Sequence, residues 1–150
     1  MSSYDGPTGT PTDSPWDWVN AHTKEYVESN GAKGHIWQNV PTLLITTKGR
    51  RTGRARRTPL IYGRDGDNYL VVASKGGSDT HPEWFLNLTA HPHVELQVGA
   101  ERLRARARVA TPAEKPRLWS IMTKIWPDYD NYQKSTTREI PVVVLEPLAA

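Results

Sequence analysis

The stretch TLLITTKGRRTGRARRTPLIYG, residues 42–63, decides the fold of this 150-residue chain. It starts with TLLITT at 42–47 and ends with RTPLIYG at 57–63, and each of these pieces is typical of a buried strand. Between the two pieces lie two glycines, and six of the ten residues from 48 to 57 are basic. The sequence therefore predicts two strands joined by a flexible, strongly basic turn.

Four later segments have the composition or the alternation of strands: NYLVVAS (68–74), HVELQVG (93–99), RLRARARVA (102–110) and IPVVVLEP (140–147). We expect RDGDN to form the turn before the first of them, and the second and third to pair as a hairpin around Gly99 and Ala100. The third also places its arginines, Arg102 to Arg108 at every second position, on one face of the strand. The sheet is expected to be mostly antiparallel.

Three helices are expected outside this sheet. The first spans 15–29, with Ser14 as its N-cap and Asn30-Gly31 as its end, and the second spans 82–90. The third is opened by a capping box, Thr111 to Glu114, and is followed after Trp126-Pro127 by a short helical turn at 128–133. Residues 1–13 are rich in Ser, Thr, Gly and Pro and predict a disordered tail, which leaves 14–150 as one domain. The fold class is α+β, a small barrel with peripheral helices.

Composition excludes several classes of function. The chain has no cysteine, which rules out disulfides, thiolate zinc sites and iron–sulfur ligation and suits a reducing cytoplasm. Its N-terminus lacks the basic and apolar regions of a signal peptide, and no apolar run approaches the roughly 20 residues of a membrane span. We therefore expect a cytoplasmic protein without a transmembrane segment and without a bound metal.

The basic turn predicts an anionic ligand. Arginine outnumbers lysine five to one there, and its planar fork suits bidentate contact with carboxylate or phosphate. Neither a P-loop nor a dinucleotide-binding glycine pattern is present. A solvated charged loop is the alternative, but no acid lies between Val40 and Asp65, and such crowded charge destabilises a fold unless an anion binds.

Two other stretches carry candidate chemistry. In ASKGGSDTHPEW (73–84), paired glycines after a strand allow a flat ligand or another backbone to approach closely, although an ordinary strand-to-helix connection is the alternative. In WPDYDNYQ (126–133), three aromatic side chains recur every third residue. They are suited to line a pocket for a flat substrate, or else to cover a core.

Taken in this order, LLITTKGRRTGRARRTPLIY, LVVASKGGSDTHPEWFLNLTAHPHVELQV and WPDYDNYQKSTTREIPVVVLEP resemble the deazaflavin-dependent nitroreductases, also called the quinone reductases that use coenzyme F420. The resemblance covers residues 37 to 147. It implies a split β-barrel like that of the flavin-nucleotide oxidoreductases, and reduced coenzyme F420, an 8-hydroxy-5-deazaflavin, as hydride donor.

The resemblance also implies site residues. Coenzyme binding would involve Lys48, Arg50, Arg51, Thr52, Arg56, Arg57, Pro59, Ala73, Ser74, Lys75, Gly76, Gly77, Trp84 and Asn87. Among these, the basic side chains would hold the phosphate and oligoglutamate tail, while the ASKGG block would lie against the ring system. The substrate side would be lined by Ile61, Tyr62, Trp126, Tyr129 and Tyr132. We expect the catalytic residues to be Tyr132 as proton donor, Tyr129 as the residue that shapes the pocket, and Ser74 as a hydrogen-bond donor to the substrate carbonyl.

The chain departs from the family pattern at Ile61, where some members have a tyrosine, at Trp126, which is often a tyrosine, and at Arg51, which replaces a lysine. These differences leave the acceptor open between a quinone, an activated enone and a nitro compound. The alternatives to this function are a flavin-mononucleotide oxidoreductase of the same fold, a coenzyme carrier without turnover, and a non-catalytic polyanion- or nucleic-acid-binding module.

The partners expected are therefore small molecules. A net charge of +3 argues against a nucleic-acid partner. The N-terminal helix is less apolar than the membrane-associating segment of some relatives, so we expect little peripheral membrane contact. A monomer and a homodimer are both compatible with the sequence.

Overall fold

The computed structural model describes residues 6–7, 11, 17–37 and 40–148, and within these ranges it leaves out the side chains of 17–20 and 37. The helices are α1 (Asp17–Glu28), α2 (Glu83–Ala90), α3 (Lys115–Ile125) and α4 (Asp128–Lys134), with a single 3-10 turn, η1 (Lys75–Gly77). The strands are β1 (Ile36–Trp37), β2 (Val40–Lys48), β3 (Ala55–Ile61), β4 (Gly63–Asp65), β5 (Asn68–Val72), β6 (His93–Val98), β7 (Glu101–Val109) and β8 (Val142–Pro147).

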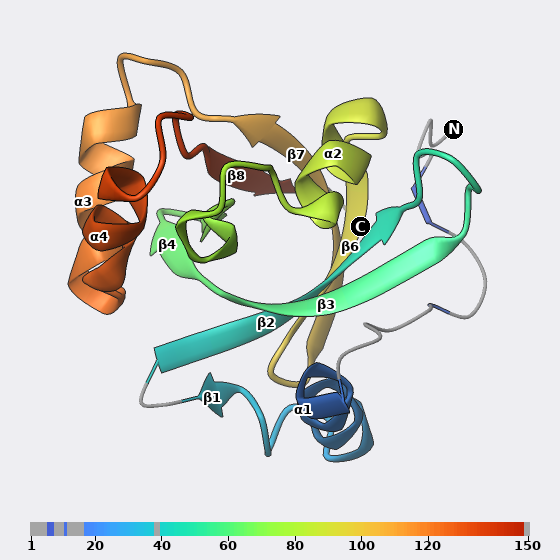
Figure 1. The fold of residues 1–150 in the computed structure, drawn as a ribbon. Helices are drawn as coiled ribbons and strands as arrows, with labels where there is room; N and C mark the ends of the chain where they lie inside the picture. Colours follow the sequence, from blue (N-terminus) through green and yellow to red (C-terminus); the bar gives the residue numbers. More distant parts are fainter. Residues whose placement is uncertain (1–5, 8–10, 12–16, 38–39, 149–150) are drawn as a thin grey trace.

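These strands form one antiparallel sheet in the order β1-β2-β6-β7-β8-β5-β4, with β3 paired to β2. The sheet curls on itself, α2 lies across one end, and α3 and α4 lie together on one outer side (Figure 1). The expected α+β class and antiparallel barrel are confirmed. The hairpin around Gly99 and Ala100 is also confirmed, because β6 and β7 pair from His93 opposite Arg106 to Val98 opposite Glu101.

The predicted strand at 57–63 is wrong in one respect, because the chain forms two strands there. The residues before Tyr62 pair with β2, with Thr42 opposite Ile61. Those after it pair with β5, with Gly63 opposite Leu70. At the break, the Tyr62 backbone N–H donates to the Pro41 carbonyl over 3.1 Å. The break at Tyr62 cannot be seen in the sequence, since it depends on which distant strand lies beside each half of the segment.

Two apolar clusters share β5 and β8. Tyr69 and Val71 of β5 face the inner cluster inside the barrel, while Leu70 and Val72 face the outer cluster under α3 and α4. The same alternation divides β8 between the two clusters. Strands that are buried on both faces need the nearly continuous apolar sequences seen here, and these two strands form the rigid centre of the molecule.

The helices close the remaining faces. Phe85 and Leu88 of α2 enter the inner cluster, and Leu118 and Met122 of α3 enter the outer one. Tyr26 of α1 is fully buried, and its hydroxyl donates to the Thr42 carbonyl over 3.0 Å. Burial raises the pKa of Tyr26 to about 12, so it stays protonated. The predicted end of α1 at Asn30-Gly31 is confirmed by their positive φ angles, whereas Ser14 lies outside the described residues.

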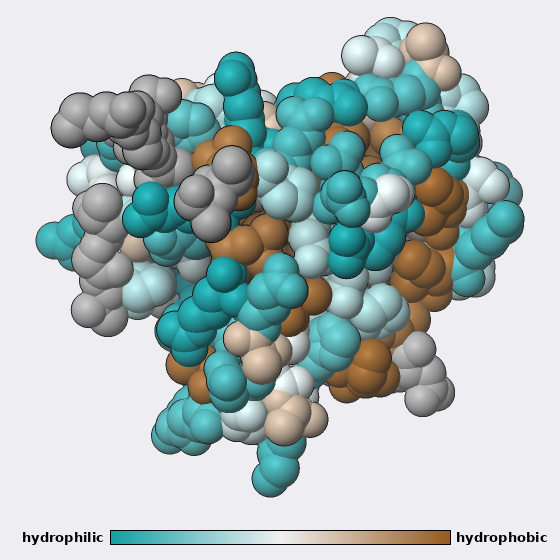
Figure 2. Space-filling model, turned by 180° about the vertical axis from the view of Figure 1, so that it is seen from behind, coloured by the Kyte–Doolittle hydropathy of each residue, from teal (hydrophilic) through white to brown (hydrophobic). Residues whose placement is uncertain are grey.

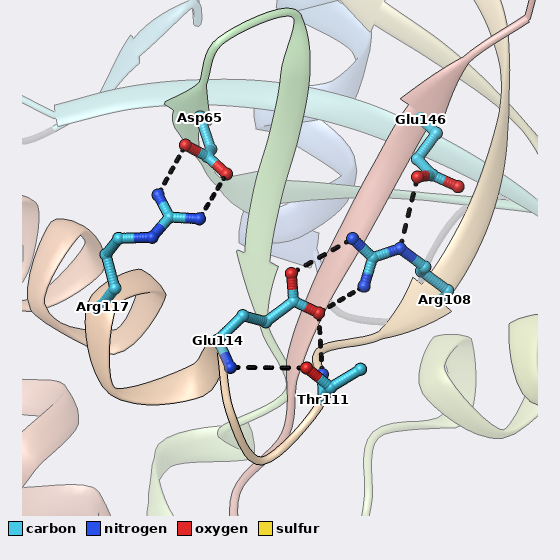
Figure 3. Close-up of polar contacts among 6 residues, drawn as sticks. All are labelled: Asp65, Arg108, Thr111, Glu114, Arg117 and Glu146. Carbon is cyan, nitrogen blue, oxygen red and sulfur yellow. Dashed lines mark hydrogen bonds and ion pairs between the residues drawn. The ribbon is translucent and has the colours of Figure 1, made fainter.

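The start of α3 is held by a cluster of polar side chains (Figure 3). Thr111 and Glu114 form the predicted capping box: the Thr111 N–H donates to Glu114 Oε2 over 2.8 Å, and the Glu114 N–H donates to Thr111 Oγ1 over 3.3 Å. Arg108 of β7 pairs with Glu114 and also with Glu146 of β8. The predicted face of arginines on β7 therefore includes one member that joins two strands to a helix.

The surface is polar over most of its area. Seen from behind, it shows several separate apolar areas among hydrophilic side chains (Figure 2). Among the described residues, the large apolar side chains that are exposed are Ile36, Val109 and Leu148. Within the same part of the chain, every helix is too short or too polar to span a lipid bilayer.

Candidate functional site

The basic turn lies between β2 and β3 and is closed by its own backbone. Gly53 N–H donates to the Gly49 carbonyl and Gly49 N–H donates to the Arg54 carbonyl, each over 2.8 Å. Gly53 has a φ of 72°, in the left-handed region that glycine adopts without strain. The turn is therefore a defined structure that presents several arginine side chains from a short length of chain.

Arg50 joins this turn to α2. Its backbone N–H and its Nη1 both donate to Asn87 Oδ1, over 3.2 and 2.9 Å, and Nη1 lies 2.7 Å from Glu83 Oε2. Asn87 is buried and donates in turn to Thr47 Oγ1 over 3.3 Å. Asn87, which was expected to contact the coenzyme, is thus engaged in holding the basic turn against the helix.

The ASKGG block forms a tight turn after β5. Lys75, Gly76 and Gly77 all have positive φ angles, of 46°, 62° and 82°. A Cβ on Gly77 would lie 2.8 Å from the backbone oxygen of Tyr132, so this glycine lets the turn pack against α4. A Cβ on Gly76 would meet nothing within 4 Å. The two glycines therefore differ, because Gly77 meets another backbone while Gly76 stays open to a ligand.

The basic turn and the ASKGG turn meet at the start of α2. The pKa of the Glu83 carboxyl is lowered, first by its hydrogen bond to Arg50 and also by the charges of Arg51 and Lys75. Lys75 is exposed and its Nζ donates to Thr80 Oγ1 over 3.0 Å. Arg50 forms the ion pair with Glu83, while Arg51 and Lys75 act on the same carboxylate through their charges, so positive charge is in excess among these residues. Such an excess at a surface attracts anions.

The remaining residues predicted to bind the coenzyme lie around the point where the two turns meet, and they differ in their exposure to solvent. Arg51, Thr52 and Arg56 are exposed on the turn and the start of β3, whereas Lys48, Arg57 and Pro59 are half-buried. Pro59 lies on β3, opposite Leu44 of β2. In the described sheet β3 pairs with β2 alone, so the missing N–H of Pro59 breaks no hydrogen-bond ladder. Trp84 of α2 is half-buried against the inner cluster.

Ser74 and Ala73 lie directly before η1 and are both buried. Their carbonyl oxygens accept hydrogen bonds from Arg138, over 2.7 Å for Ser74 and 3.0 Å for Ala73. Within the described part of the chain, the Ser74 hydroxyl makes no hydrogen bond, which leaves it available to a ligand.

The predicted aromatic wall is assembled from α4, the end of α3 and the end of β3. Ile61, Trp126 and Tyr132 are half-buried and pack against the outer cluster. Trp126 Nε1 donates to the Tyr132 hydroxyl oxygen over 3.3 Å. The Tyr129 ring packs at 74° to that of Tyr132, with centroids 6.1 Å apart. At 4% exposure Tyr129 is a core residue, and burial raises its pKa well above the usual tyrosine value.

Tyr62 is not brought to this wall. Its side chain belongs to the inner cluster, on the other face of the chain from Ile61, and its hydroxyl lies 2.9 Å from His35 Nε2. Its ring also lies 5.7 Å from that of Tyr69. The structure therefore gives Tyr62 a place between α1 and the barrel, which is the change of face expected when a strand alternates.

Three residues at the site were missed by the sequence analysis: Glu83, His81 and Arg138. His81 Nδ1 lies 3.1 Å from Arg138 Nη1, and its pKa is lowered by burial and then by the Arg138 charge. Arg138 follows α4 in TTREIP, 60 residues away from Ser78, whose carbonyl it also binds. No spacing or composition marks these residues, because their proximity depends on how distant segments fold together. Among the described residues, no group of three or more histidine or acidic side chains is placed to hold a metal ion.

This arrangement suits a ligand with an anionic part and a flat part. The cations at the start of α2 are placed to bind the anionic part. Gly76 leaves open space for the flat part, and the turn that contains it packs against α4, the helix that carries Tyr132. A tyrosine hydroxyl and a serine hydroxyl are available nearby as proton or hydrogen-bond donors.

Comparison with known proteins identifies relatives of this chain. The family model for the F420H(2)-dependent quinone reductases matches residues 18–147. An F420H(2)-dependent quinone reductase from Mycobacterium tuberculosis is 45% identical over 131 residues, which cover 85% of this chain and 88% of that protein.

Two solved structures are also similar. One, an F420-H2-dependent reductase (FDR-A), is 37% identical with a TM-score of 0.66, covering 71% of this chain and 94% of the other. The second, described as a domain-swapped dimer, is 35% identical with a TM-score of 0.69, covering 89% of this chain and 100% of the other.

Proposed function

From the premise that this chain belongs to the family of F420H(2)-dependent quinone reductases, we propose that it transfers a hydride from reduced coenzyme F420 to a quinone. The observation that carries the proposal is the ion pair of Arg50 with Glu83 at the start of α2, where the charges of Arg51 and Lys75 also act, beside a glycine turn that packs against the helix of Tyr132. The same meeting point explains why the sequence crowds arginine into one turn.

The residues present fit this coenzyme. Its phosphate and oligoglutamate tail require several cations on one surface, and arginine supplies two-pronged contacts to both groups. Arg50 is pre-positioned by Asn87 and Glu83, so less conformational freedom is lost when an anion binds. Arg51, Arg56 and Lys75 are exposed and add further contacts. These side chains contribute affinity and not chemistry.

When bound, reduced F420 supplies the hydride. The protein's part is to orient the acceptor and to provide a proton, since reduction of a quinone to a hydroquinone takes up one hydride and, in net, one proton. Tyr132 is our candidate donor. Its oxygen accepts the Trp126 N–H, which leaves its own hydroxyl proton free to be donated to an acceptor oxygen.

Ser74 and Tyr129 have supporting roles in this proposal. The Ser74 hydroxyl would donate a hydrogen bond to the acceptor's carbonyl oxygen, where negative charge develops. Tyr129 lies behind Tyr132 in the outer cluster and shapes the wall by packing, since its own hydroxyl group is buried. Ile61 and Trp126 complete the apolar side of the wall.

The direct test is a turnover assay with reduced F420 against a panel of quinones, activated enones and nitroaromatics, followed by loss of the coenzyme's absorbance. We expect quinones to be reduced with the highest kcat/KM. If only enones or nitro compounds are reduced, the proposed acceptor is wrong and the proposed hydride donor stands. Binding of F420 without turnover of any acceptor would instead indicate a coenzyme carrier.

A parallel fluorescence titration compares F420 with flavin mononucleotide. Tight binding of the flavin and none of F420 would overturn the choice of cofactor. A third titration with a single-stranded oligonucleotide tests the polyanion alternative, for which binding would be steeply dependent on salt.

A further inference from the structure

In the described structure, the Arg138 guanidinium binds backbone carbonyl oxygens in and beside the ASKGG turn. Its Nη2 donates to the Ser74 carbonyl, its Nη1 to the Ala73 carbonyl, and its Nε to the Ser78 carbonyl over 2.9 Å. The turn thus has backbone oxygens on both sides of η1 bound to one guanidinium. A planar group with five N–H donors is the one side chain that can span such a set.

The turn needs such support because its backbone is unusual. Lys75 has a φ of 46°, which a residue with a side chain rarely adopts, and two glycines in the same region follow it. Two internal hydrogen bonds close the turn, from the Gly77 N–H to the Ser74 carbonyl over 3.0 Å and from the Ser78 N–H to the Lys75 carbonyl over 3.1 Å. The hydrogen bonds from Arg138 add support from outside the segment.

Arg138 is itself tied to the helix of Tyr132. The side chain of Gln133, the next residue on α4, donates to the Arg138 carbonyl over 2.8 Å and accepts the Ile140 N–H over 2.9 Å. Thr136, two residues before Arg138, donates to Asp79 over 2.7 Å. The segment 136–140 therefore connects the acceptor-side helix to both ends of the coenzyme-side turn.

The charge of Arg138 is not neutralised by its direct contacts. In the described part of the chain its hydrogen-bonding partners are three carbonyl oxygens and a ring nitrogen of His81, and none is a carboxylate. Burial lowers the pKa of Arg138, but an arginine remains protonated at any physiological pH. It therefore adds a fixed positive charge directly behind the ASKGG turn.

From these contacts we infer that Arg138 is a positioning residue for the proposed reaction: it fixes the ASKGG turn in its ligand-binding shape and sets its place relative to Tyr132. The inference rests on the proposed function for its catalytic consequence. Its structural half, that one guanidinium orders residues 73–81, stands on the free protein alone.

The experiment compares Arg138→Ala and Arg138→Lys with Arg108→Ala. Arg108 is a matched control because it is also a half-buried arginine with several hydrogen bonds, but its partners are Glu114 at the start of α3 and Glu146 on β8 (Figure 3). Amide hydrogen exchange of the free proteins is measured first. We expect exchange across 74–81 to accelerate at least about tenfold in both Arg138 variants and to stay at the wild-type rate in the control.

Coenzyme binding and steady-state kinetics are measured on the same three variants. Arg138→Ala should raise the Kd for F420 about tenfold and lower kcat by about ten- to a hundredfold, because misplaced reacting groups lose rate as well as affinity. Arg138→Lys keeps the charge but not the fork, so it should recover affinity more than kcat. Added guanidinium chloride at low concentration should partly restore both values in Arg138→Ala only.

Unchanged exchange across 74–81 in both Arg138 variants would refute the inference. So would equal losses of kcat in the Arg138 and Arg108 variants without guanidinium rescue, since that result indicates general destabilisation. If Arg138→Ala does not fold, Arg138→Lys decides by the same measurements. Failure of the wild-type protein to bind F420 would refute the proposed function instead, and the exchange comparison would still decide whether Arg138 orders the turn.

Discussion

Two sites in this molecule place arginine in opposite electrostatic surroundings. Arg108 lies between two carboxylates, Glu114 and Glu146, and joins β7, β8 and the start of α3 (Figure 3). At the start of α2, by contrast, Arg50 pairs with Glu83, and the charges of Arg51 and Lys75 also act on this one carboxylate. The comparison teaches that the balance of charge, and not the presence of arginine, separates a structural site from a binding site.

A stability argument supports this distinction. Where carboxylates equal or outnumber the arginines, as around Arg108, no further anion is needed, although each exposed pair contributes only about 0.2–1 kcal/mol. A group of cations with too few carboxylates repels itself until an anion binds. Changes in the two places should therefore have different consequences, one for folding and the other for binding.

The largest effect is expected at Tyr132, which lies across the turn from the cationic group. Tyr132→Phe removes the hydroxyl alone and should lower kcat by about a hundredfold or more if that proton is donated in the reaction. The Kd for F420 should change little, because the ring and its packing remain. Steady-state kinetics and a fluorescence titration measure the two quantities. An unchanged kcat would transfer the role of proton donor to solvent.

The next effect is expected at Arg50. Arg50→Ala should raise the Kd for F420 by about ten- to a hundredfold, since a charge-assisted hydrogen bond contributes about 1.5–3 kcal/mol. The loss should shrink at high salt, where the wild-type attraction is screened. Arg54→Ala is the matched control: it removes an exposed arginine from the same turn, one that donates no side-chain hydrogen bond in the described structure. Equal effects of the two substitutions would mean that only total charge matters.

A change at Arg108 should act on folding alone. Arg108→Ala leaves two carboxylates close together and should lower the free energy of unfolding by about 1–2 kcal/mol, measured by urea denaturation. The Kd for F420 should remain that of the wild type. A weakened Kd at unchanged stability would break the comparison, because it would place Arg108 and its two carboxylates in the binding machinery.

The smallest effect is a pH dependence of the same cluster. The hydrogen bond from Arg108, followed by that from the Thr111 N–H, lowers the pKa of Glu114 from 4.5 to about 2. Because the folded-state pKa is the lower one, the stabilisation is complete above pH 4.5 and is lost as the pH falls toward 2. The stability difference between wild type and Glu114→Gln, about 1 kcal/mol at pH 6, should therefore shrink toward pH 2.5.

Urea midpoints of the two proteins at intervals between pH 2.5 and 6 measure this difference. A carboxylate whose lowered pKa does not depend on Glu114, such as Glu83 beside Arg50, is common to both proteins and cancels in the comparison. A difference that stays constant over this range would show that Glu114 gains its stability from packing and not from its charge.

Much of the fold follows from local sequence. The alternation in β6 and β7, the capping box at Thr111 and the stop at Asn30-Gly31 each depend on residues within a few positions of one another, and all three are confirmed. The resemblance to F420-dependent enzymes was also visible, because the family pattern lies in short motifs kept in order. The split of one predicted strand at Tyr62 was not visible, since it depends on which distant strand lies alongside.

The sequence by itself determined the elements, the concentration of cations in the β2–β3 turn, and the glycines of the ASKGG turn, because backbone conformation and charge density are local properties. Tertiary structure alone decided that Arg50 pairs with Glu83, that Gly77 meets Tyr132, and that Arg138 binds the carbonyls of Ala73 and Ser74. These contacts join segments up to 65 residues apart along the chain. Their geometry is set by the closure of the barrel and the packing of α2 and α4 on it, which no local pattern records.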